Sequence, residues 1–475
     1  MTVLTLNADI RAAAQAVAET EEFSIHRAPF NDRHWSSAES LPHAELRELQ
    51  QQRFLATVRH VWNNNRWYRQ LWSDAGVNID DIKGLDDIGR LPFITKPLIR
   101  QSQLDAPPYG LMLSDNQTPA DVSRLAMTSG TTGKPVLLPF ARRDYAVWME
   151  GVVRSLWASG VRDTDVVHAA FGFTPFIGLA GAYDAAERWI GALVVPGGSW
   201  DSNIRINMLP LLGVTVLMGT PTYLLRLGRL AVEQGHDLST WPITKLFVTG
   251  EVGPSSSPAT GRRLAELWHA EVHEFCGTQE TNYFAWDCPH GSFHWNEDLV
   301  YAEVLDPETR QPVAEGQPGE LVVTDLLQRT HPLIRFPTGD LVAGIETRAC
   351  GCGRTLRHFK GFLGRIDDVV KIRGVSIAQG GLEHAIRSYA GASDDYEIEF
   401  SSDRDGLDRV LVRVEPTADL DEAGAKTFSA ELEEVIHRNL FVSVKVEPVP
   451  RGSLPRYELK AKRIRDNRVR REQAQ

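Results

Sequence analysis

The chain has 475 residues, of which 42% are hydrophobic and 24% charged, and this composition and length predict a globular protein with more than one domain. Its formal net charge of −11 argues against a nucleic-acid-binding role. Four cysteines in so long a chain do not form a disulfide framework, so a cytoplasmic protein is expected.

The N-terminus does not have the pattern of a signal peptide, and the most apolar window of the chain does not have that of a membrane helix. The segment MTVLTLNADIRAAAQAVAETEEF contains acidic residues and no uninterrupted apolar run. The most apolar window, residues 166–183, contains His168, Pro175 and three glycines. Such a window is unsuited to a bilayer, so we expect buried core or a pocket wall there and no membrane partner.

The predicted elements begin with a helical region over residues 46–71, where apolar residues recur at helical spacing, and a break follows at L-P-F-I-T-K-P. Further along, short apolar runs alternate with helical patterns. Strands are predicted over 166–171, 192–195, 215–218 and 245–248, and helices over 183–191, 221–233 and 261–270. This alternation predicts an α/β domain with stacked, mostly parallel sheets.

The last part of the chain predicts a strand-rich part and then a second, smaller domain. Residues 297–340 read as strands and turns, with a turn at G-Q-P-G over 316–319. Strands are then predicted over 369–372, 396–400, 410–414 and 442–446, and helices over 381–389 and 430–439. We therefore predict a large N-terminal domain over residues 1–364 and a small, mobile α+β domain over 365–475.

The stretch T-S-G-T-T-G-K-P-V over 128–136 has the composition of a phosphate-binding loop. Glycine lets backbone N–H groups converge on anionic oxygens, and hydroxyl groups and a lysine add donors and charge. The spacing is not that of a Walker loop, because Gly130 and Gly133 are separated by two residues and Lys134 is followed by Pro135. The loop therefore predicts a different class of phosphate chemistry, and a P-loop phosphotransferase is the weaker alternative.

Four further motifs follow in order: C-G-T-Q-E at 276–280, R-F-P-T-G-D at 335–340, G-R-I-D-D-V-V-K-I-R-G at 364–374 and P-R-Y-E-L-K-A-K-R at 455–463. Together with the loop they resemble the signatures of the adenylate-forming superfamily of acyl-CoA synthetases, adenylation domains and luciferases. Within it, R-F-L-A-T-V-R-H-V, W-Y-R, L-P-F-I-T-K and H-P-L-I-R-F are most similar to the phenylacetate–CoA ligase family.

The resemblance implies a role for each matching residue. ATP would be bound by Thr128, Ser129, Gly130, Thr131, Thr132, Gly133, Lys134, Gly277, Thr278, Asp340 and Arg365. Glu280 would hold Mg²⁺ and, with Lys460, be catalytic, and Asp367 would be the hinge about which the small domain rotates. The chain departs from the family pattern at Cys276, Gln279 and Leu459, so Lys462 remains a rival of Lys460.

An acyl pocket is expected to be apolar with few polar groups. The segment F-G-F-T-P-F-I-G lies where the related family builds its aryl pocket, and the candidate residues are Phe171, Phe176, Gly178 and Gly250. We therefore expect ATP-dependent activation of a small aromatic acid, aryl or arylacetic, followed by transfer to coenzyme A. Transfer to a carrier-protein thiol or an amine is the alternative, and a homodimer is left open.

The cysteines suggest one metal site. Cys288 and His294 are separated by five residues, and Cys350 and Cys352 by one. Thiolates and imidazole in this number suit a closed, tetrahedral Zn²⁺ site of structural type. Members of the related family carry such a site at matching positions. His290 is an alternative ligand, and free buried cysteines are the alternative to a metal site.

Overall fold

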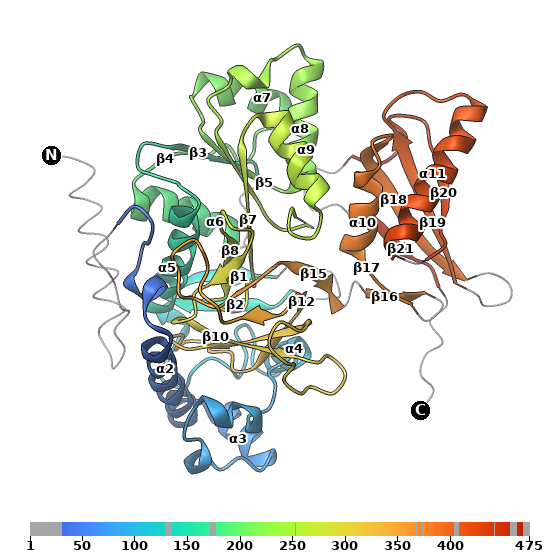
Figure 1. The fold of residues 1–475 in the computed structure, drawn as a ribbon. Coiled ribbons are helices and arrows are strands. Elements are labelled where there is room, and N and C mark those ends of the chain that lie inside the picture. Colours follow the sequence, from blue (N-terminus) through green and yellow to red (C-terminus); the bar gives the residue numbers. More distant parts are fainter. Residues whose placement is uncertain are drawn as a thin grey trace. The chain divides into compact units, whose positions relative to one another are not determined.

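Figure 1 shows the fold in a computed structural model, which describes residues 31–128, 135–171, 177–251, 253–366, 369–372, 375–402, 408–440, 442–456 and 463–468. Contacts divide the chain into two compact units. The first contains Met1–Met218 and Phe275–Gly361, and the second contains Gly219–Glu274 and Phe362–Gln475. This division also assigns a middle segment to the second unit, so the domain boundary after residue 364 stays a prediction.

The predicted helical region near the start of the described chain consists of two helices. Helix α2 (His43–Asn64) ends at Asn65, which is the N-cap of α3 (Arg66–Asp74). The Asn65 side chain accepts a hydrogen bond from the Tyr68 N–H at 2.9 Å and donates one to the Met112 carbonyl at 3.0 Å. The prediction of a helical region over 46–71 is confirmed, and the region is divided into two helices because this buried amide caps the backbone in a non-helical conformation.

The first unit contains several more helices and turns. They are η1 (Ser37–Ser40), η2 (Ile79–Asp81), η3 (Leu85–Arg90), α4 (Lys96–Asp105), η4 (Pro119–Asp121), α5 (Arg142–Ala158), α6 (Ile177–Asp184), the π-helix η5 (Ala185–Ile190) and α7 (Ser202–Leu211). The predicted break at L-P-F-I-T-K-P is confirmed, since α4 starts at its lysine, where Pro97 fits the first turn.

The strands of the first unit form parallel and antiparallel pairs. Strand β3 (Val166–Ala169) pairs in parallel with β4 (Leu193–Val195) and with β5 (Val216–Gly219), as the alternating pattern predicts. Antiparallel pairs join the end of β7 (Glu271–Gly277), β8 (Phe284–Asp287), β9 (Phe293–Trp295), β14 (His358–Phe359) and β13 (Ile345–Glu346). The unit is therefore α/β with an antiparallel extension.

Two further antiparallel groups complete the first unit. Strands β1 (Val122–Met127) and β2 (Leu137–Ala141) form a hairpin, and β10 (Val300–Leu305), β11 (Gly319–Asp325) and β12 (Phe336–Val342) form a sheet. The predicted turn at 316–319 lies just before β11, and Gly316 has a φ of 76°, which glycine adopts without strain.

The second unit contains a separate α+β core. Strands β20 (Lys445–Pro448), β19 (Asp408–Pro416), β18 (Ala392–Ser402) and β21 (Ile464–Asp466) form one sheet, against which α10 (Gln379–Ser388) and α11 (Glu422–Leu440) pack. The remaining elements are α8 (Pro221–Glu233), η6 (Leu238–Thr240), β6 (Lys245–Val248), α9 (Pro258–Trp268), β15 (Phe362–Arg365), β16 (Val369–Ile372) and β17 (Val375–Ala378). Among the described residues, no helix combines the length and the hydropathy needed to cross a bilayer.

A cluster of buried charges joins α2 and α5 to the loop before β10. Arg154 on α5 contacts Asp298 at 2.6 Å and Glu150 at 3.1 Å, and Arg53 on α2 contacts Asp298 at 3.3 Å. All of these side chains are at most 1% exposed. Burial raises the pKa of Asp298, but the neighbouring Arg154 and Arg53 lower it more, so the pKa lies below its ordinary value of 3.8.

We predict that Asp298→Asn lowers the free energy of unfolding by about 3–5 kcal/mol, because it leaves two buried guanidinium groups without their shared carboxylate. Since the folded-state pKa is depressed, the stabilisation is present above about pH 4 and is lost as the pH falls through the folded-state value. Denaturant unfolding at several pH values checks both effects.

The matched control is Asp86→Asn, because Asp86 pairs with Arg47 while its own side chain is 93% exposed. It should leave the free energy of unfolding within error of wild type. Equal effects of the two substitutions would contradict the importance of the buried cluster.

Candidate active site

The described residues include the base of the predicted phosphate loop. Thr128 follows β1, and its N–H donates to the Val136 carbonyl at 3.0 Å, while its hydroxyl oxygen accepts from the Val136 N–H at 3.0 Å. From α4, the Gln103 amide accepts from the Leu137 N–H at 3.1 Å and donates to its carbonyl at 2.6 Å. The two ends of the loop are therefore held together and attached to α4.

Glu280 lies in the loop that follows β7, and it is buried with 3% of its surface exposed. Its Oε1 atom lies 3.1 Å from the ammonium of Lys96, the first residue of α4. A buried carboxylate is costly without a counter-charge, and Lys96 supplies one. The sequence analysis interpreted L-P-F-I-T-K-P as a break and as a family motif, but it did not assign Lys96 a role.

Gly277 ends β7 where the chain turns toward Glu280. A Cβ atom at this position would lie 2.8 Å from the Tyr283 carbonyl oxygen, so a larger residue cannot be placed without moving the backbone. Thr278 then contacts Thr281 through a hydrogen bond of 2.6 Å between their hydroxyl groups. These contacts order the loop that carries Glu280.

Asp340 lies on β12, is 8% exposed, and its N–H donates to the Thr338 hydroxyl at 3.0 Å. The neighbouring Tyr283 is fully buried, and burial together with the charges of Cys276 and Asp340 raises its pKa well above the ordinary value. Tyr283 therefore stays a neutral donor, and its hydroxyl has no hydrogen-bond partner among the described residues. Sequence reasoning missed Tyr283, although it lies three residues after Glu280.

Arg335, the first residue of R-F-P-T-G-D, fixes the segment that leads to Lys96. Its guanidinium donates to the Leu91 carbonyl at 2.8 Å and pairs with Glu303 at 3.1 Å, and its own carbonyl accepts from the Ile94 N–H at 3.3 Å. The motif that contains Asp340 therefore also positions the start of α4.

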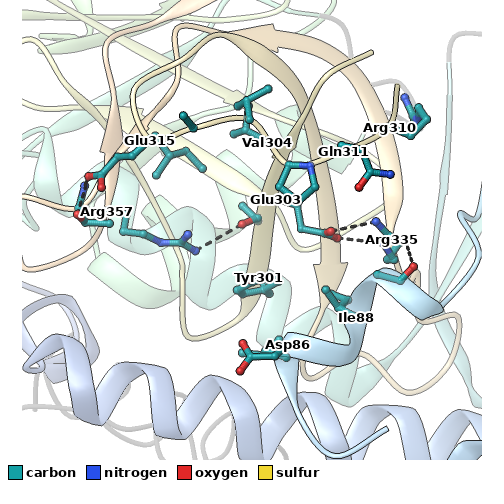
Figure 2. A pocket seen from close by; sticks show the side chains of 18 of the residues that line it. Asp86, Ile88, Tyr301, Glu303, Val304, Arg310, Gln311, Glu315, Arg335 and Arg357 are labelled. Atoms are coloured by element: carbon teal, nitrogen blue, oxygen red, sulfur yellow. Dashed lines mark hydrogen bonds and ion pairs between the residues drawn. The ribbon is translucent and has the colours of Figure 1, made fainter. Parts of the chain in front are cut away.

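Figure 2 shows a cavity of about 640 Å³ beside Arg335. Its charged side chains are paired: Arg335 with Glu303, Arg310 with Glu320 and Arg357 with Glu297. None of the residues predicted for the acyl pocket lines it. The cavity is thus a feature of the β10–β12 sheet and η3, distinct from the predicted acyl pocket.

The predicted acyl-pocket residues are only partly described. Phe171 is buried after β3, Gly178 lies in α6 with open space around its Cβ position, and Gly250 in the second unit has a φ of 84°. Phe176 lies outside the described residues.

Aromatic side chains that the sequence analysis did not single out gather on α5 near α6. Tyr145 stacks on Trp148 with ring centroids 6.2 Å apart, and Trp148 meets Phe284 edge-on, also at 6.2 Å. A Cβ atom on Gly181 would come within 2.0 Å of the Trp148 ring, so this glycine makes room for the indole. Tyr145 and Trp148 are spaced along α5 like ordinary core residues, and only the fold brings them beside α6 and Phe284 of β8.

The four predicted metal ligands converge in the first unit. The ligand atoms of Cys288, His294, Cys350 and Cys352 all lie within 4.8 Å of one another. Cys288 Sγ lies 3.7 Å from Cys350 Sγ, and Cys352 Sγ lies 3.3 Å from His294 Nε2. Tetrahedral Zn²⁺ with Zn–S bonds of about 2.3 Å keeps its sulfur ligands about 3.8 Å apart, so the donor set fits zinc.

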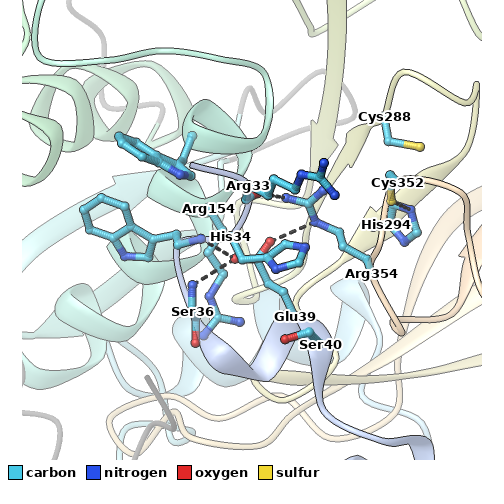
Figure 3. Close-up of polar contacts among 12 residues, drawn as sticks. Arg33, His34, Ser36, Glu39, Ser40, Arg154, Cys288, His294, Cys352 and Arg354 are labelled. Carbon is cyan, nitrogen blue, oxygen red and sulfur yellow. Dashed lines mark hydrogen bonds and ion pairs between the residues drawn. The ribbon is translucent and has the colours of Figure 1, made fainter. Parts of the chain in front are cut away.

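A buried ion pair holds the turn that carries Cys350 and Cys352 (Figure 3). Arg354 donates to Glu39 at 2.8 Å and to the Arg33 carbonyl at 2.9 Å. Glu39 also accepts from the Trp35 N–H at 2.8 Å and the Ser36 N–H at 3.0 Å. The N-terminal part of the described chain is thus attached beside the cysteine and histidine cluster.

Of the remaining predicted site residues, Arg365 is described and ends β15 in the second unit. The loop residues Ser129, Gly130, Thr131, Thr132, Gly133 and Lys134, the hinge Asp367, and both Lys460 and Lys462 lie outside the described residues. Their roles stay predictions.

The chain is similar to known proteins over most of its length. A family model described as AMP-binding enzyme matches residues 40–325, and a model for the AMP-binding enzyme C-terminal domain matches residues 374–468. A phenylacetate-coenzyme A ligase of Pseudomonas putida is 31% identical over 440 residues, which cover 89% of this chain and 94% of the relative.

Solved structures are similar over nearly the same extent. 2-Hydroxyisobutyryl-CoA ligase in the postadenylation state with 2-HIB-AMP has a TM-score of 0.85 at 28% identity, covering 94% of this chain and 95% of that chain. The same enzyme with 2-HIB-AMP and CoA in the thioesterification state has a TM-score of 0.68 at 29% identity and the same coverage.

Proposed function

The chain belongs to the AMP-binding enzymes, within the AMP-forming acyl-CoA ligases, and we propose that its substrate is a small aromatic carboxylic acid, aryl or arylacetic. The acid is activated by ATP to an acyl-adenylate, and the acyl group passes to the thiol of coenzyme A. The observation that carries the proposal is the buried Glu280–Lys96 pair, 3.1 Å apart, in a chain 31% identical to a phenylacetate-coenzyme A ligase.

In the first step a carboxylate oxygen of the acid attacks the α-phosphorus of ATP, and the bond to the β-phosphate oxygen breaks, so that pyrophosphate leaves. Negative charge gathers on the leaving group, so catalysis depends on positioning and on cationic groups. Residues Thr128 to Lys134 hold the β- and γ-phosphates, and Lys460 binds the α-phosphate and the acid. Asp340 accepts hydrogen bonds from the ribose hydroxyls, with Arg365 beside them.

Glu280 would hold the Mg²⁺ of a bound nucleotide, and this ion would supply charge stabilisation for the pyrophosphate. Lys96 is proposed to have two roles. Its ammonium neutralises Glu280, and because the Lys96 side chain is 36% exposed while Glu280 is buried, the lysine can also turn toward phosphate oxygens.

In the second step the thiol sulfur of coenzyme A attacks the acyl carbon, and the bond from that carbon to the phosphate oxygen breaks, so that AMP leaves. We propose that the C-terminal domain rotates about Asp367 between the two steps. The similar 2-hydroxyisobutyryl-CoA ligase has been solved in a postadenylation and in a thioesterification state, which supports two states for this chain as well.

An aromatic acid is favoured by the similarity to phenylacetate-coenzyme A ligase and by the aromatic side chains of Tyr145, Trp148 and Phe284. Aromatic rings pack well against one another in stacked and edge-on geometry. Phe171, Phe176, Gly178 and Gly250 are proposed to belong to the acyl pocket as well.

A panel of carboxylic acids tests the proposal, with pyrophosphate release measured in the presence and absence of coenzyme A. We expect acid-dependent release with benzoate- or phenylacetate-type acids and the matching aryl-CoA thioester by mass spectrometry. Release only with aliphatic acids would contradict the aromatic assignment, and pyrophosphate release without any thioester would contradict coenzyme A as the acceptor.

Replacing Lys96 tests the proposed site. Lys96→Met is expected to slow acid-dependent pyrophosphate release on the order of 10²-fold, because it removes a cationic group next to the site where charge develops. Lys96→Arg keeps the charge and should retain more activity than the Met variant. Wild-type rates in the Met variant, with the protein folded by circular dichroism, would rule out this role.

We also propose that Cys288, His294, Cys350 and Cys352 hold one structural Zn²⁺. Purified protein should contain about one zinc per chain, and Cys352→Ser should contain much less and unfold at a lower temperature. His290→Ala is the matched control, because His290 lies next to Gly351 but outside the four-residue cluster. Full zinc content in Cys352→Ser, or zinc loss only in His290→Ala, would contradict the assignment.

A further inference from the structure

One carboxylate in the second unit receives arginine side chains from three helices. Asp394, near the start of β18, is 4% exposed. It pairs with Arg229 of α8, with Arg263 of α9 at 2.9 Å and with Arg387 of α10 at 3.5 Å. Two of these arginines come from the segment Gly219–Glu274, whereas Asp394 and Arg387 come from the C-terminal segment.

Further hydrogen bonds cross between the same two segments. Arg263 donates to the carbonyls of Tyr389 and Ala392, at 3.4 Å and 3.3 Å, where the chain passes from α10 to β18. In the other direction, the buried Arg387 donates to the Thr260 hydroxyl on α9 at 3.0 Å. The contact is therefore centred on Asp394 and joins α8 and α9 to α10 and β18.

This contact is polar, whereas the C-terminal segment has its own hydrophobic core. That core is made of buried residues between Leu382 and Val446, and the described members include none from Gly219–Glu274. A contact made of ion pairs and hydrogen bonds over two separate cores can open without exposing a shared apolar surface. The C-terminal segment can therefore leave α8 and α9 as an intact body.

The distribution of charges keeps the cost of opening low. After separation, Asp394 retains Arg387, because both belong to the C-terminal segment, so no buried carboxylate loses all of its partners. Arg229 and Arg263 are already 39% and 19% exposed, respectively, and can be solvated at their positions. The ion pairs therefore hold the two segments together when the contact is closed. When it is open, each charged side chain keeps a partner or is solvated.

We propose that Asp394 is a positioning residue that latches the C-terminal segment onto α8 and α9 during adenylation, and that this latch opens for transfer to coenzyme A. The inference rests on the proposed function, since it assigns the two states of the latch to the two half-reactions. It adds to that function the residue that sets the balance between the states.

Asp394→Asn tests the latch, because it removes the charge and keeps the shape of the side chain. We expect acid-dependent ATP–pyrophosphate exchange to fall about tenfold, the range of a typical coupling between two states. Single-turnover formation of the thioester from a supplied acyl-adenylate and coenzyme A should stay at the wild-type rate or rise. Arg263→Gln, on the other side of the contact, should likewise slow ATP–pyrophosphate exchange without slowing formation of the thioester.

Glu397→Gln is the matched control, because Glu397 lies on the same strand and pairs with Arg465 at 2.8 Å inside the C-terminal segment. It should leave the ratio of the two half-reaction rates unchanged. Equal losses in both half-reactions of Asp394→Asn, or no change in either, would overturn the latch. Should the Asn variant fail to fold, Arg263→Gln decides by the same criteria.

Hydrogen exchange separates failure of the latch from failure of the proposed function. Amides of α9 and α10 should exchange faster in Asp394→Asn than in wild type or Glu397→Gln. If no acid supports ATP–pyrophosphate exchange in the wild type, the proposed function fails. The latch is tested independently of that result, because unchanged protection of the α9 and α10 amides in Asp394→Asn would overturn it.

Discussion

A carboxylate removed from water needs a counter-charge, and this requirement organises the candidate site. Glu280 is 3% exposed, and its partner Lys96 comes from a segment far away in the sequence. The pair forms only if α4 begins beside the loop that follows β7. Arg335 secures that placement through Leu91 and Ile94, while Gln103 on the same helix holds the base of the phosphate loop. One short helix thus connects the loop, the buried carboxylate and the R-F-P-T-G-D motif.

The sequence could predict those parts of the fold and site that depend on local pattern. The strands β3 to β6 and the helix α8 follow from apolar runs and helical spacing, so their positions agree with the structure to within a few residues. The four metal-ligand candidates were also identifiable, because cysteine and histidine at short spacings are rare outside metal sites. The structure brings these four side chains together, which the spacing alone could not establish.

Interactions between distant segments could not be predicted from a single sequence. Asn65 interrupts a pattern that is helical in its apolar positions, because its amide finds a partner at Met112. Lys96 and Tyr283 gain their importance only from what the fold places beside them. The same holds for Asp394, whose arginine partners lie on three separate helices and follow no periodic signal. Charge pairs between distant segments are therefore the feature that the structure shows and that the sequence alone could not predict.

The central claim, that an acid oxygen attacks the α-phosphorus of ATP, has a direct test in isotope transfer. The protein is incubated with ATP, coenzyme A and an aromatic acid whose carboxylate carries ¹⁸O, and the nucleotide product is analysed by mass spectrometry. The account predicts AMP that contains one ¹⁸O atom, because the attacking oxygen stays on phosphorus when the thiol displaces AMP. ADP as the product, with ¹⁸O in inorganic phosphate, would place the attack on the γ-phosphorus and contradict the account.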